Sequence, residues 1–506
     1  MQSPSPHARV DRALDQVFRR HADRPALLEG DEVWTYGALD RHLADAAAML
    51  AERGCRPGDR IVIASENSRA LALLFLAAQR LDIWPVVVNP RLSARELDQI
   101  VAHSGARLTL FNTAGAPAKA HAERLGARPA PVAGLDVIAA GPLDVDATPE
   151  PLDDDPAERV AAMLYTSGTT GAPKGVMLSH RNLMFNARVT AELRGLTPED
   201  CVYTALPMSH VVGLSSLLLT TLLSGGRLRL ADRFDAADAF RLVRTETTML
   251  TGVPATWQRL LEHMRAEGME TAPPGPLRYL SVAGAPLDPR LKAQVEAAFG
   301  LPLLNAYGIT ECAPGISSVR EEAPRDDTSV GPILPGLETR LMGPDGEEVA
   351  PGEVGELHVR GPNVMKGYYR APDLTRAAID PQGWFNTGDL ARMEAGGLFI
   401  AGRTKELIIR SGFNVYPPEV EAVLADHPDV AQSAVVGRAR DGNEEVVAYV
   451  QLLPGARATG AEIMAFAAAR LTAYKRPCEV VIMDALPAAA TGKLLKHKLK
   501  ELAATA

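Results

Sequence analysis

The sequence predicts an α/β protein with a parallel-sheet core, a small β region and a mixed α+β end. Three observations support this fold class. Short apolar runs alternate with helical patterns as far as Glu311, short extended pieces with frequent glycine begin near residue 328, and a mixed pattern resumes after Gly402. Strands that alternate with helices favour parallel βαβ units. Because 506 residues are too many for one hydrophobic core, we expect roughly two to four domains.

Composition and charge narrow the function classes. The hydrophobic share of 46% and the charged share of 23% are those of an ordinary globular protein. The net charge of −9 argues against a nucleic-acid binder. The four cysteines lie far apart, without a CxxC or Cys/His cluster, so we expect free thiols in a reducing cytoplasm rather than a disulfide scaffold or a zinc site. Residues 1–10 lack the apolar core of a signal peptide, so we expect a cytoplasmic protein.

One stretch has a composition close to that of a membrane span. Cys201–Gly226 contains no Asp, Glu, Lys or Arg. However, Pro207, His210, Gly213 and several serines interrupt it. We therefore expect a buried helix that lines a cleft, and no membrane span.

The N-terminal part begins with helical patterns over 11–52 around an extended piece at 32–36. Strands and helices then alternate. The predicted strands are 60–64, 84–89 and 108–111, and the predicted helices between them are 68–81 and 94–104. Residues 114–155 are rich in Ala, Pro and Gly and are predicted to form a partly ordered connection.

The alternation resumes after a glycine-rich loop at 165–175. The predicted strands are 226–230, 248–250, 279–283 and 303–305, and the predicted helices are one from Ser179, 236–246 and 288–299, the last closed by Gly300. Two of these strands run into the segments Gly284–Pro286 and Tyr307–Glu311. Such sheets bind ligands just beyond the carboxyl ends of their strands, so these segments are candidate site residues.

The pattern of predicted secondary structure changes twice in the last third of the chain. Extended pieces at 339–342, 355–359 and 398–400 predict a small barrel-like β region. After Gly402-Arg403 the predicted elements are helices 418–426 and 460–471, strands 430–437 and 446–452, and a terminal helix from Leu494. About 100 residues suffice for a separate domain.

The loop Tyr165–Gly175 has the composition of a phosphate cradle. After the tyrosine it holds four hydroxyl side chains, three glycines and Lys174, with no acidic residue. Glycines let the backbone approach a ligand closely, and consecutive N–H groups form an anion-binding concavity. A solvated surface loop is the alternative for such a stretch. The order of its residues is not that of the P-loop.

Five motifs together resemble the adenylate-forming enzymes, the superfamily of acyl-CoA synthetases, nonribosomal peptide synthetase adenylation domains and firefly luciferase. The likeness covers essentially the whole chain and is nearest to benzoate-, coumarate- and medium-chain-type acyl-CoA ligases. The motifs, in the family's order, are Tyr165–Gly175, Asn305–Glu311, Phe385–Asp389, Gly402–Glu406 and Thr491–Lys493.

The resemblance implies a division of the chain into two domains. Residues 1–402 are expected to form an AMP-binding domain of two parallel α/β subdomains plus a small β-barrel-like subdomain. Residues 403–506 are expected to form a mobile α+β lid that rotates at the hinge residue Lys405. Such enzymes adenylate a carboxylate with ATP and Mg²⁺, release pyrophosphate, and pass the acyl group to a thiol such as that of CoA.

The resemblance also implies roles for single residues. Glu311 is expected to bind Mg²⁺, a hard ion that prefers oxygen, and Thr310 to contact the α-phosphate. Lys493 is expected to reach the α-phosphate and the substrate carboxylate during adenylation, as a flexible point charge that can arrive and leave. The residues expected around the β- and γ-phosphates are Thr166, Ser167, Gly168, Thr169, Thr170 and Lys174.

The nucleoside and CoA contacts follow from the same likeness. Asp389 is expected to accept hydrogen bonds from both ribose hydroxyls, a role that suits its two acceptor oxygens, and Arg403 to reach the same ribose. The segment expected around adenine comprises Gly284, Ala285, Pro286, Asn305, Ala306, Tyr307 and Gly308, with Tyr307 stacked on the ring and Asn305 bonded to its amino edge. Gly412 is expected at the CoA thiol tunnel with Phe413. A core aromatic and a solvated acid are the alternatives for Tyr307 and Glu311.

The acid is predicted to be a hydrophobic monocarboxylate, aromatic or short- to medium-chain aliphatic. In the family, the acyl pocket lies between segments that match 207–214, 251–254, 281–285 and 306–316, and Glu311 is their only charged residue. A second carboxylate would need a cation, and Ala306 stands where malonate-activating relatives carry Arg. His210 matches the gate between pocket and thiol tunnel, with a satisfied buried histidine as the alternative.

Two other functions are also compatible with the sequence. A free-standing adenylating enzyme could load the phosphopantetheine of a carrier protein instead of CoA. A non-catalytic relative could bind nucleotide only, although Lys174, Glu311, Asp389, Arg403 and Lys493 are all present. A monomer and a homodimer are both compatible with the sequence.

Overall fold

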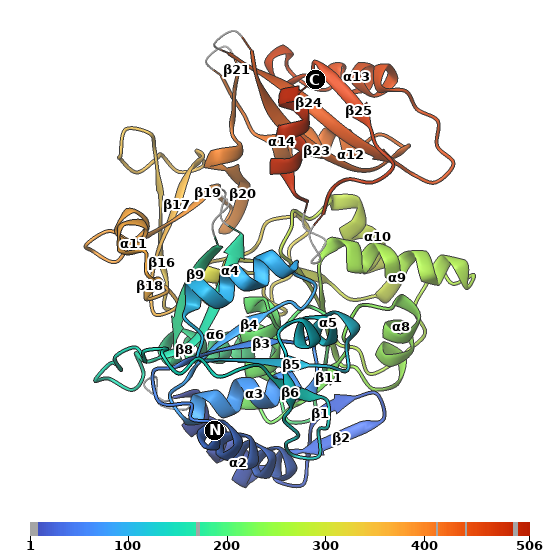
Figure 1. Ribbon diagram of the computed structural model, residues 1–506. Helices are drawn as coiled ribbons and strands as arrows, with labels where there is room; N and C mark the ends of the chain where they lie inside the picture. The colour runs from blue at the N-terminus through green and yellow to red at the C-terminus, as the bar shows by residue number, and fades with distance from the viewer. Residues whose placement is uncertain (1–8, 168–172, 411–412, 441–442, 489–493, 506) are drawn as a thin grey trace.

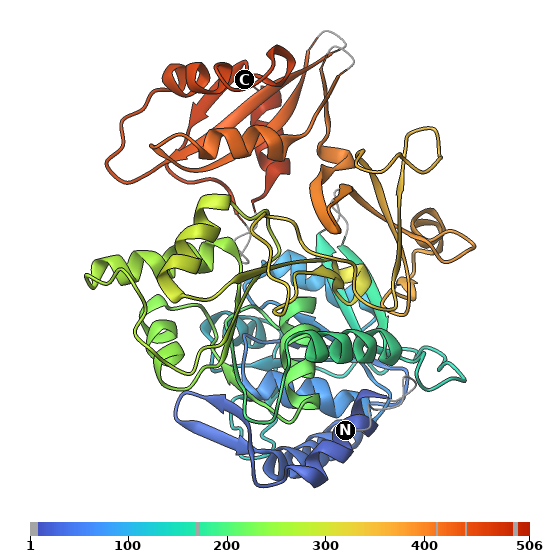
Figure 2. The same cartoon turned by 180° about the vertical axis from the view of Figure 1, so that it is seen from behind.

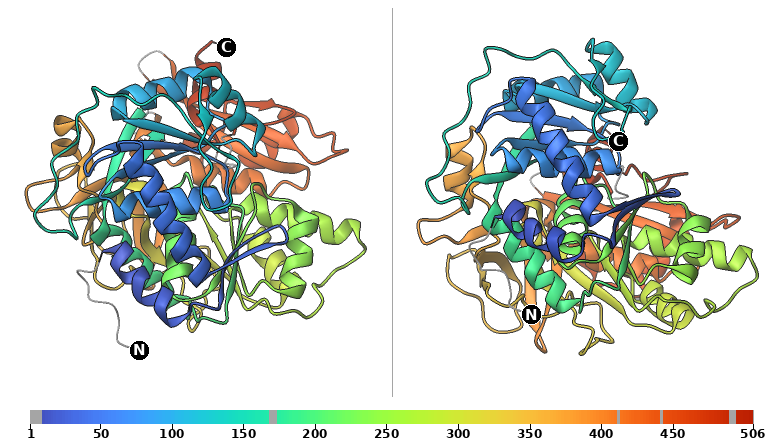
Figure 3. Two further views of the ribbon diagram at one scale, coloured as in Figure 1. Left: turned by 60° about the horizontal axis from the view of Figure 1, so that its bottom comes forward. Right: turned by 90° about the horizontal axis from the view of Figure 1, so that it is seen from below.

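The computed structural model describes residues 9–167, 173–410, 413–440, 443–488 and 494–505. A large body holds two eight-stranded sheets, and a smaller C-terminal unit lies above it (Figures 1 and 2). Seen from below, the chain of one sheet, blue and teal, and most of the chain of the other, green, occupy two halves of the body (Figure 3). The α/β fold class predicted from the sequence is confirmed.

The first sheet has six parallel strands with an antiparallel strand at each edge. Its middle strands are short and largely buried, with Leu, Val, Met and Tyr among their residues, as expected for a sheet covered on both faces. In spatial order the strands are β15 (Gly315–Ser318), β14 (Leu303–Gly308), β13 (Tyr279–Ala283), β12 (Met249–Gly252), β10 (Cys201–Thr204), β11 (Arg227–Leu230), β1 (Pro25–Glu29) and β2 (Glu32–Thr35).

The second sheet has a parallel centre of β8, β4, β3 and β5. Antiparallel strands extend it on both sides, and on one side β8 pairs with β9. In spatial order the strands are β18 (Gly367–Tyr368), β9 (Pro173–Ser179), β8 (Val160–Ser167), β4 (Trp84–Val88), β3 (Arg60–Ala64), β5 (Leu108–Asn112), β7 (Ile138–Ala140) and β6 (Arg128–Pro129).

The helix α3 (Arg69–Arg80) joins the two halves. Its residues Ala70–Gln79 are all buried, and it packs on β3 and β4 of one sheet and on β1 of the other. A helix that is apolar all round belongs in a core, and Ser68 caps its first turn through the N–H of Leu71. The other helices of the body are α1 (Val10–Arg20), α2 (Tyr36–Glu52), α4 (Ala94–Ser104), α5 (Ala116–Arg124), α6 (His180–Leu193), α7 (Thr220–Leu223), α8 (Ala236–Thr245), α9 (Pro254–Ala266), α10 (Pro289–Phe299) and α11 (Pro372–Ala378).

The β region predicted near residue 328 is a four-stranded antiparallel sheet. The C-terminal unit then packs three helices on a three-stranded sheet around apolar clusters of its own. The strands of the β region are β16 (Glu338–Met342), β17 (Gly355–Arg360), β19 (Phe385–Glu394) and β20 (Gly397–Arg403), and the C-terminal elements are β21 (Ile408–Arg410), β22 (Phe413–Val415), α12 (Pro417–Ala425), β23 (Val430–Arg440), β24 (Asn443–Leu452), α13 (Gly460–Ala468), β25 (Glu479–Ile482) and α14 (Lys496–Thr505). Since β20 ends at Arg403, the boundary predicted between residues 402 and 403 falls on the last residue of a strand.

One local prediction was wrong, and two were incomplete. Residues 25–29 form β1, although only helices and the piece at 32–36 were expected in 11–52. The connection 114–155 contains α5 and the short strands β6 and β7, because alanines that read as loop composition lie on a helix packed against β5. In Cys201–Gly226 the first four residues form β10, and only Val211–Leu223 is helical, with Val212–Leu219 in π-helical geometry. Within the described ranges, no helix is both long and apolar enough to cross a bilayer.

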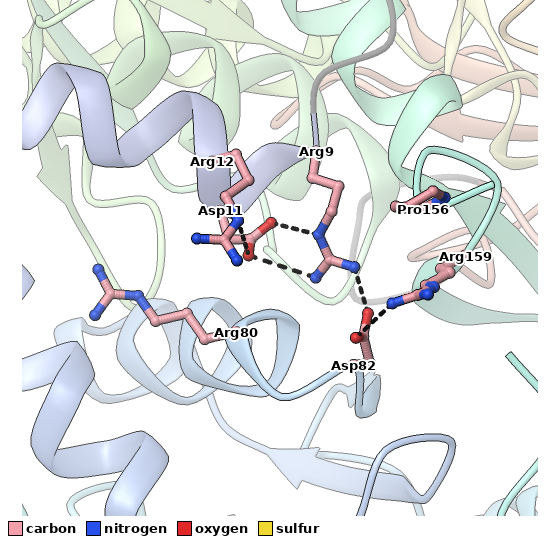
Figure 4. Close-up of a pocket in the computed structure, with 7 residues that line it drawn as sticks. All are labelled: Arg9, Asp11, Arg12, Arg80, Asp82, Pro156 and Arg159. Carbon is pink, nitrogen blue, oxygen red and sulfur yellow. Dashed lines mark hydrogen bonds and ion pairs between the residues drawn. The ribbon is translucent and has the colours of Figure 1, made fainter. Parts of the chain in front are cut away.

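An ion cluster fastens the start of α1 to the body (Figure 4). Arg9 pairs with Asp11 and with Asp82, just after α3, and the other oxygen of Asp82 accepts a 2.8 Å hydrogen bond from Arg159. The backbone N–H of Val10 donates to Nδ1 of His180, the first residue of α6, over 3.3 Å. The beginning of the chain is thereby tied to three segments that are distant in sequence.

Candidate active site

The described ends of the glycine-rich stretch, Tyr165–Ser167 and Pro173–Gly175, lie on the paired strands β8 and β9. The strands are in register with Thr166 opposite Lys174 and Ser167 opposite Pro173. The predicted phosphate-loop residues Gly168, Thr169 and Thr170 lie outside the described residues. Thr166 and Lys174 are partly exposed at the end of the hairpin. The hairpin therefore presents a hydroxyl and an ammonium group from two adjacent strands.

Tyr368 connects this hairpin to Glu311. The strand β18 pairs with β9, so that Tyr368 lies opposite Val176, two residues beyond Lys174. The Tyr368 hydroxyl donates to Oε1 of Glu311 over 3.0 Å, and its ring centroid lies 5.2 Å from Nζ of Lys174. Burial, followed by the charge of Glu311, raises the pKa of Tyr368, which keeps the hydroxyl protonated. The predicted metal ligand and the predicted phosphate-binding lysine thus share one neighbour.

Glu311 fits a magnesium ion on its donor chemistry. Oε2 of this partly exposed carboxylate makes no hydrogen bond or ion pair with a described residue. The described residues contain no group of three or more His, Cys, Asp and Glu that could hold a metal by themselves. Magnesium sites with one or two carboxylates, substrate phosphates and water are common, so a single free oxygen beside a phosphate loop suits this ion.

Three neighbouring strands bring the other predicted residues to one edge of the first sheet. In the parallel register Val282 lies opposite Asn305, and Ala283 lies opposite Ala306. The carboxyl ends of β12, β13 and β14 therefore lie together, and β13 continues into Gly284–Pro286. Gly284 has φ +86°, which only glycine adopts readily, and this sends the chain away from the edge. The edge is where a parallel sheet binds its ligand.

Asp389, Tyr307 and Arg403 form a compact cluster at this edge. Asp389 is 3% exposed, its Oδ2 accepts from the Tyr307 hydroxyl, and its Oδ1 lies 3.1 Å from Nε of Arg403. Burial, and then the charge of Asp389, raises the pKa of Tyr307. Burial alone would lower the pKa of Arg403, but Asp389 and Glu406 raise it. The cluster places a buried carboxyl group with two acceptor oxygens between a tyrosine hydroxyl and a guanidinium group.

Asn305 has a polar atom without a partner. Its Nδ2 donates to the carbonyl of Thr328 over 2.9 Å, while its Oδ1 is buried and accepts no hydrogen bond from a described residue. Buried acceptors are rarely left unpaired in native proteins. The role predicted for Asn305, bonding to the amino edge of adenine, would give this oxygen a donor.

The predicted acyl-pocket segments meet at the same edge. Val212, Val253 and Ile309 are partly exposed, whereas Met208, Val282 and Ile316 are buried. The buried hydroxyls of Thr251 and Ser281 bond to each other over 2.8 Å. His210 is exposed, so the buried-histidine alternative is wrong, while its gate role stays a prediction. The site wall is largely apolar.

Some of the remaining predicted site residues lie within the described structure, and others do not. Thr310 and Glu311 share a single 3₁₀ turn after β14, and the hinge candidate Lys405 is exposed in a second 3₁₀ turn, Thr404–Glu406. Lys493 and Gly412 lie outside the described residues. Tyr368 was missed from the sequence. The dipeptide Gly367-Tyr368 stands between two recognised motifs and has no periodicity of its own, so only its pairing with β9 reveals it.

Comparisons with known proteins agree with this geometry. Residues 14–369 match the AMP-binding enzyme family, and residues 419–493 match the AMP-binding enzyme C-terminal domain. The chain is 36% identical to a feruloyl-CoA synthase of Amycolatopsis sp, over 94% of this chain and 95% of that protein. It is 35% identical to a 2-succinylbenzoate–CoA ligase of Geobacillus kaustophilus, over 95% of each chain.

One solved relative has been seen in two states. The chain is 30% identical to MatB from Rhodopseudomonas palustris, and the alignment covers 98% of this chain and 99% of MatB. The TM-score is 0.85 with ATP-bound MatB and 0.75 with apo MatB. The arrangement of this chain is therefore closer to that of the ATP-bound relative.

Proposed function

Because the chain belongs to the AMP-binding enzyme family and is an ATP-dependent acid–CoA ligase, we propose that its acid is a hydrophobic monocarboxylate, aromatic or short- to medium-chain aliphatic. The observation that carries this proposal is the wall of the predicted acyl pocket. Its partly exposed side chains include Val212, Val253 and Ile309, and Glu311 is the only charged residue in the four segments. A second carboxylate or an ammonium group on the substrate would be buried there without a partner of opposite charge.

We propose that the strand edge of the first sheet binds the nucleoside. Asn305 Oδ1 accepts from the adenine amino group, Tyr307 lies against the ring, and Asp389 accepts from the ribose hydroxyls. The orphaned Asn305 oxygen and the buried carboxylate of Asp389 support these roles. Gly284, Ala285 and Pro286 flank the base, together with Ala306 and Gly308 of β14. Arg403 reaches the ribose from the end of β20.

We propose that the hairpin tip and Glu311 hold the triphosphate. Thr166, Ser167, Lys174 and the loop between them bind the β- and γ-phosphates, Thr310 binds the α-phosphate, and Glu311 is the protein ligand of Mg²⁺. The ion supplies charge neutralisation for the phosphate oxygens. The carboxylate of the acid attacks the α-phosphorus, the bond to the pyrophosphate oxygen breaks, and an acyl-adenylate and pyrophosphate result. Fixed donors offset the charge that develops on the α-phosphate.

The second half-reaction takes place after the C-terminal domain has rotated. We propose that Lys493 assists adenylation, that residues 403–506 turn about Lys405, and that CoA enters past Gly412 with His210 as its gate. The CoA thiolate attacks the acyl carbonyl and AMP leaves with the bonding electrons. A domain rotation separates the two steps, because a group needed in the first can be withdrawn in the second.

Pyrophosphate release with a panel of acids tests the proposal. The panel contains aromatic acids, medium-chain fatty acids, dicarboxylic acids and amino acids, each with ATP and Mg²⁺ in the presence and absence of CoA. We expect release with aromatic or aliphatic monocarboxylates and acyl-CoA formation when CoA is added. A preference for dicarboxylic or amino acids would overturn the substrate class. Adenylation without any acyl-CoA would instead indicate a carrier-protein acceptor.

A further inference from the structure

We propose that Tyr368 is the positioning residue that couples the magnesium ligand Glu311 to the phosphate-binding residue Lys174. The proposal rests on the roles proposed above for Glu311 and Lys174, and adds a residue that fixes both. Tyr368 is 9% exposed, so it is a component of the interior and not a surface contact. Its two ends face different partners, since the hydroxyl bonds to Glu311 and the ring lies beside the Lys174 ammonium.

The backbone around Tyr368 is fastened on both sides. The N–H of Met365 donates to the carbonyl of Glu311 over 2.9 Å, and the N–H of Tyr369 donates to the carbonyl of Gly175 over 2.8 Å. Thr375 accepts from the N–H of Tyr368 over 2.9 Å. The segment 365–369 therefore spans from the 3₁₀ turn of Glu311 to the strand of Lys174, and Tyr368 is held in place independently of its side-chain contacts.

The hydrogen bond selects how Glu311 can bind a cation. With Oε1 engaged by the Tyr368 hydroxyl, Oε2 is the free oxygen, so the carboxylate is prepared for binding through one atom. Magnesium prefers such single-oxygen ligation in a near-octahedral shell that retains water. Groups that orient a metal ligand typically change metal affinity about 10- to 100-fold when removed.

The ring has a separate effect on the lysine. A cation 5.2 Å from an aromatic centroid is attracted to the face of the ring. Lys174 makes no ion pair with a described residue, so the ring of Tyr368 is the group that holds its ammonium at the hairpin end. Removal of the hydroxyl should therefore weaken only nucleotide binding that depends on the metal. Removal of the whole ring should also weaken nucleotide binding without the metal.

Calorimetric binding of ATP tests this, with Mg²⁺ and with EDTA, on the purified full-length chain. We expect Tyr368→Phe to weaken ATP binding about 10-fold in Mg²⁺ and to leave binding in EDTA unchanged, in line with other metal-orienting partners. Tyr368→Leu should weaken binding in both conditions, because the ring is lost as well. Tyr369→Phe is the matched control, since the Tyr369 hydroxyl bonds to Glu150 and not to the site.

The outcomes separate this inference from the function on which it rests. If Tyr368→Phe binds ATP like Tyr369→Phe in Mg²⁺, the positioning role is wrong. If Glu311→Gln also keeps the full Mg²⁺ effect, the assignment of the metal ligand fails. Because no acid is needed for ATP binding, neither result depends on the substrate proposal. Equal thermal melting of the ligand-free Phe variants confirms that both are folded.

Discussion

At the scale of single residues, Asn305 offers a direct test of base recognition. Its Oδ1 is buried without a partner, so a nucleotide with a donor at that place should be preferred over one without. ATP has an amino group at position 6 of its base, whereas ITP has an oxygen. A site built to hydrogen-bond one group rejects an analogue that lacks it, because its own polar atom is then left unpaired.

We expect Asn305→Ala to remove most of the preference for ATP over ITP. An unpaired buried group costs about 1–3 kcal/mol, which corresponds to a preference of roughly 10- to 100-fold in the unchanged protein. The measurement is the ratio of kcat/KM for ATP and ITP in pyrophosphate release. Since the ratio is taken within each variant, a general loss of activity cancels. An unchanged ratio would show that Oδ1 does not face the base.

The resemblance of the five motifs to a known family named the candidate site residues but not the contacts between them. The structure brings Tyr307 of the motif Asn305–Glu311 into contact with Asp389 of the motif Phe385–Asp389. The hydrogen bond between Tyr368 and Glu311 could not be predicted, because the two residues are 57 positions apart and meet only through the pairing of β18 with β9. Contacts of this kind depend on register, which local sequence does not determine.

At the scale of elements, the side chain of His180 lies where α1 meets α6, and its burial makes the stability of the protein depend on pH. Its ring is fully buried, and the N–H of Val10 donates to Nδ1, so the ring accepts there and is neutral. Burial, then the nearby charge of Arg9, lowers the pKa of His180 to about 3, with an opposing effect of Asp82 and a further lowering by Arg159. In the unfolded chain the imidazole would titrate near its ordinary pKa.

We expect the protein to lose stability as the pH falls from about 6.5 towards 3, because the unfolded chain then binds a proton that the folded chain does not. His180 alone should account for about 2 kcal/mol between pH 7.5 and pH 5. The measurement is the urea-unfolding free energy at both pH values for the natural chain and for His180→Asn, whose amide oxygen can still accept from Val10. Equal pH dependence of the two proteins would contradict the prediction.

Strands and helices with a clear period were predicted to within a few residues, whereas weakly patterned ones were not. The strand at 60–64 and the helix at 94–104 coincide with β3 and α4, since a continuous apolar run and a Ser93–Glu96 capping box mark them. The strand β1 was missed because its apolar part is only the triplet Ala26–Leu28, and it becomes a strand only through pairing with β11 and β2. Tertiary pairing decides such short segments.

At the scale of the whole molecule, one exposed ion pair bridges the body and the C-terminal unit away from the proposed hinge at Lys405. Arg290 of α10 lies 2.6 Å from Asp426, which follows α12, and both side chains are about half exposed. The C-terminal unit lies directly above α10 in Figures 1 and 2. Near the hinge, Thr404 donates to Glu356 over 2.8 Å. Contacts that exist in one orientation of two domains bias the equilibrium between orientations.

We expect Arg290→Glu to slow adenylation about two- to fivefold, since an exposed pair contributes at most about 1 kcal/mol to the orientation that contains it. This arrangement is the one closer to the ATP-bound relative, so thioester formation from a supplied acyl-adenylate should be unaffected or faster. Pyrophosphate release without CoA and acyl-CoA formation from the adenylate measure the two steps. Arg241→Glu, which breaks the exposed Arg241–Asp238 pair within α8, controls for the charge change. The double reversal Arg290→Glu with Asp426→Arg should restore the rate, and an effect equal in both half-reactions would show that the pair does not act on domain orientation.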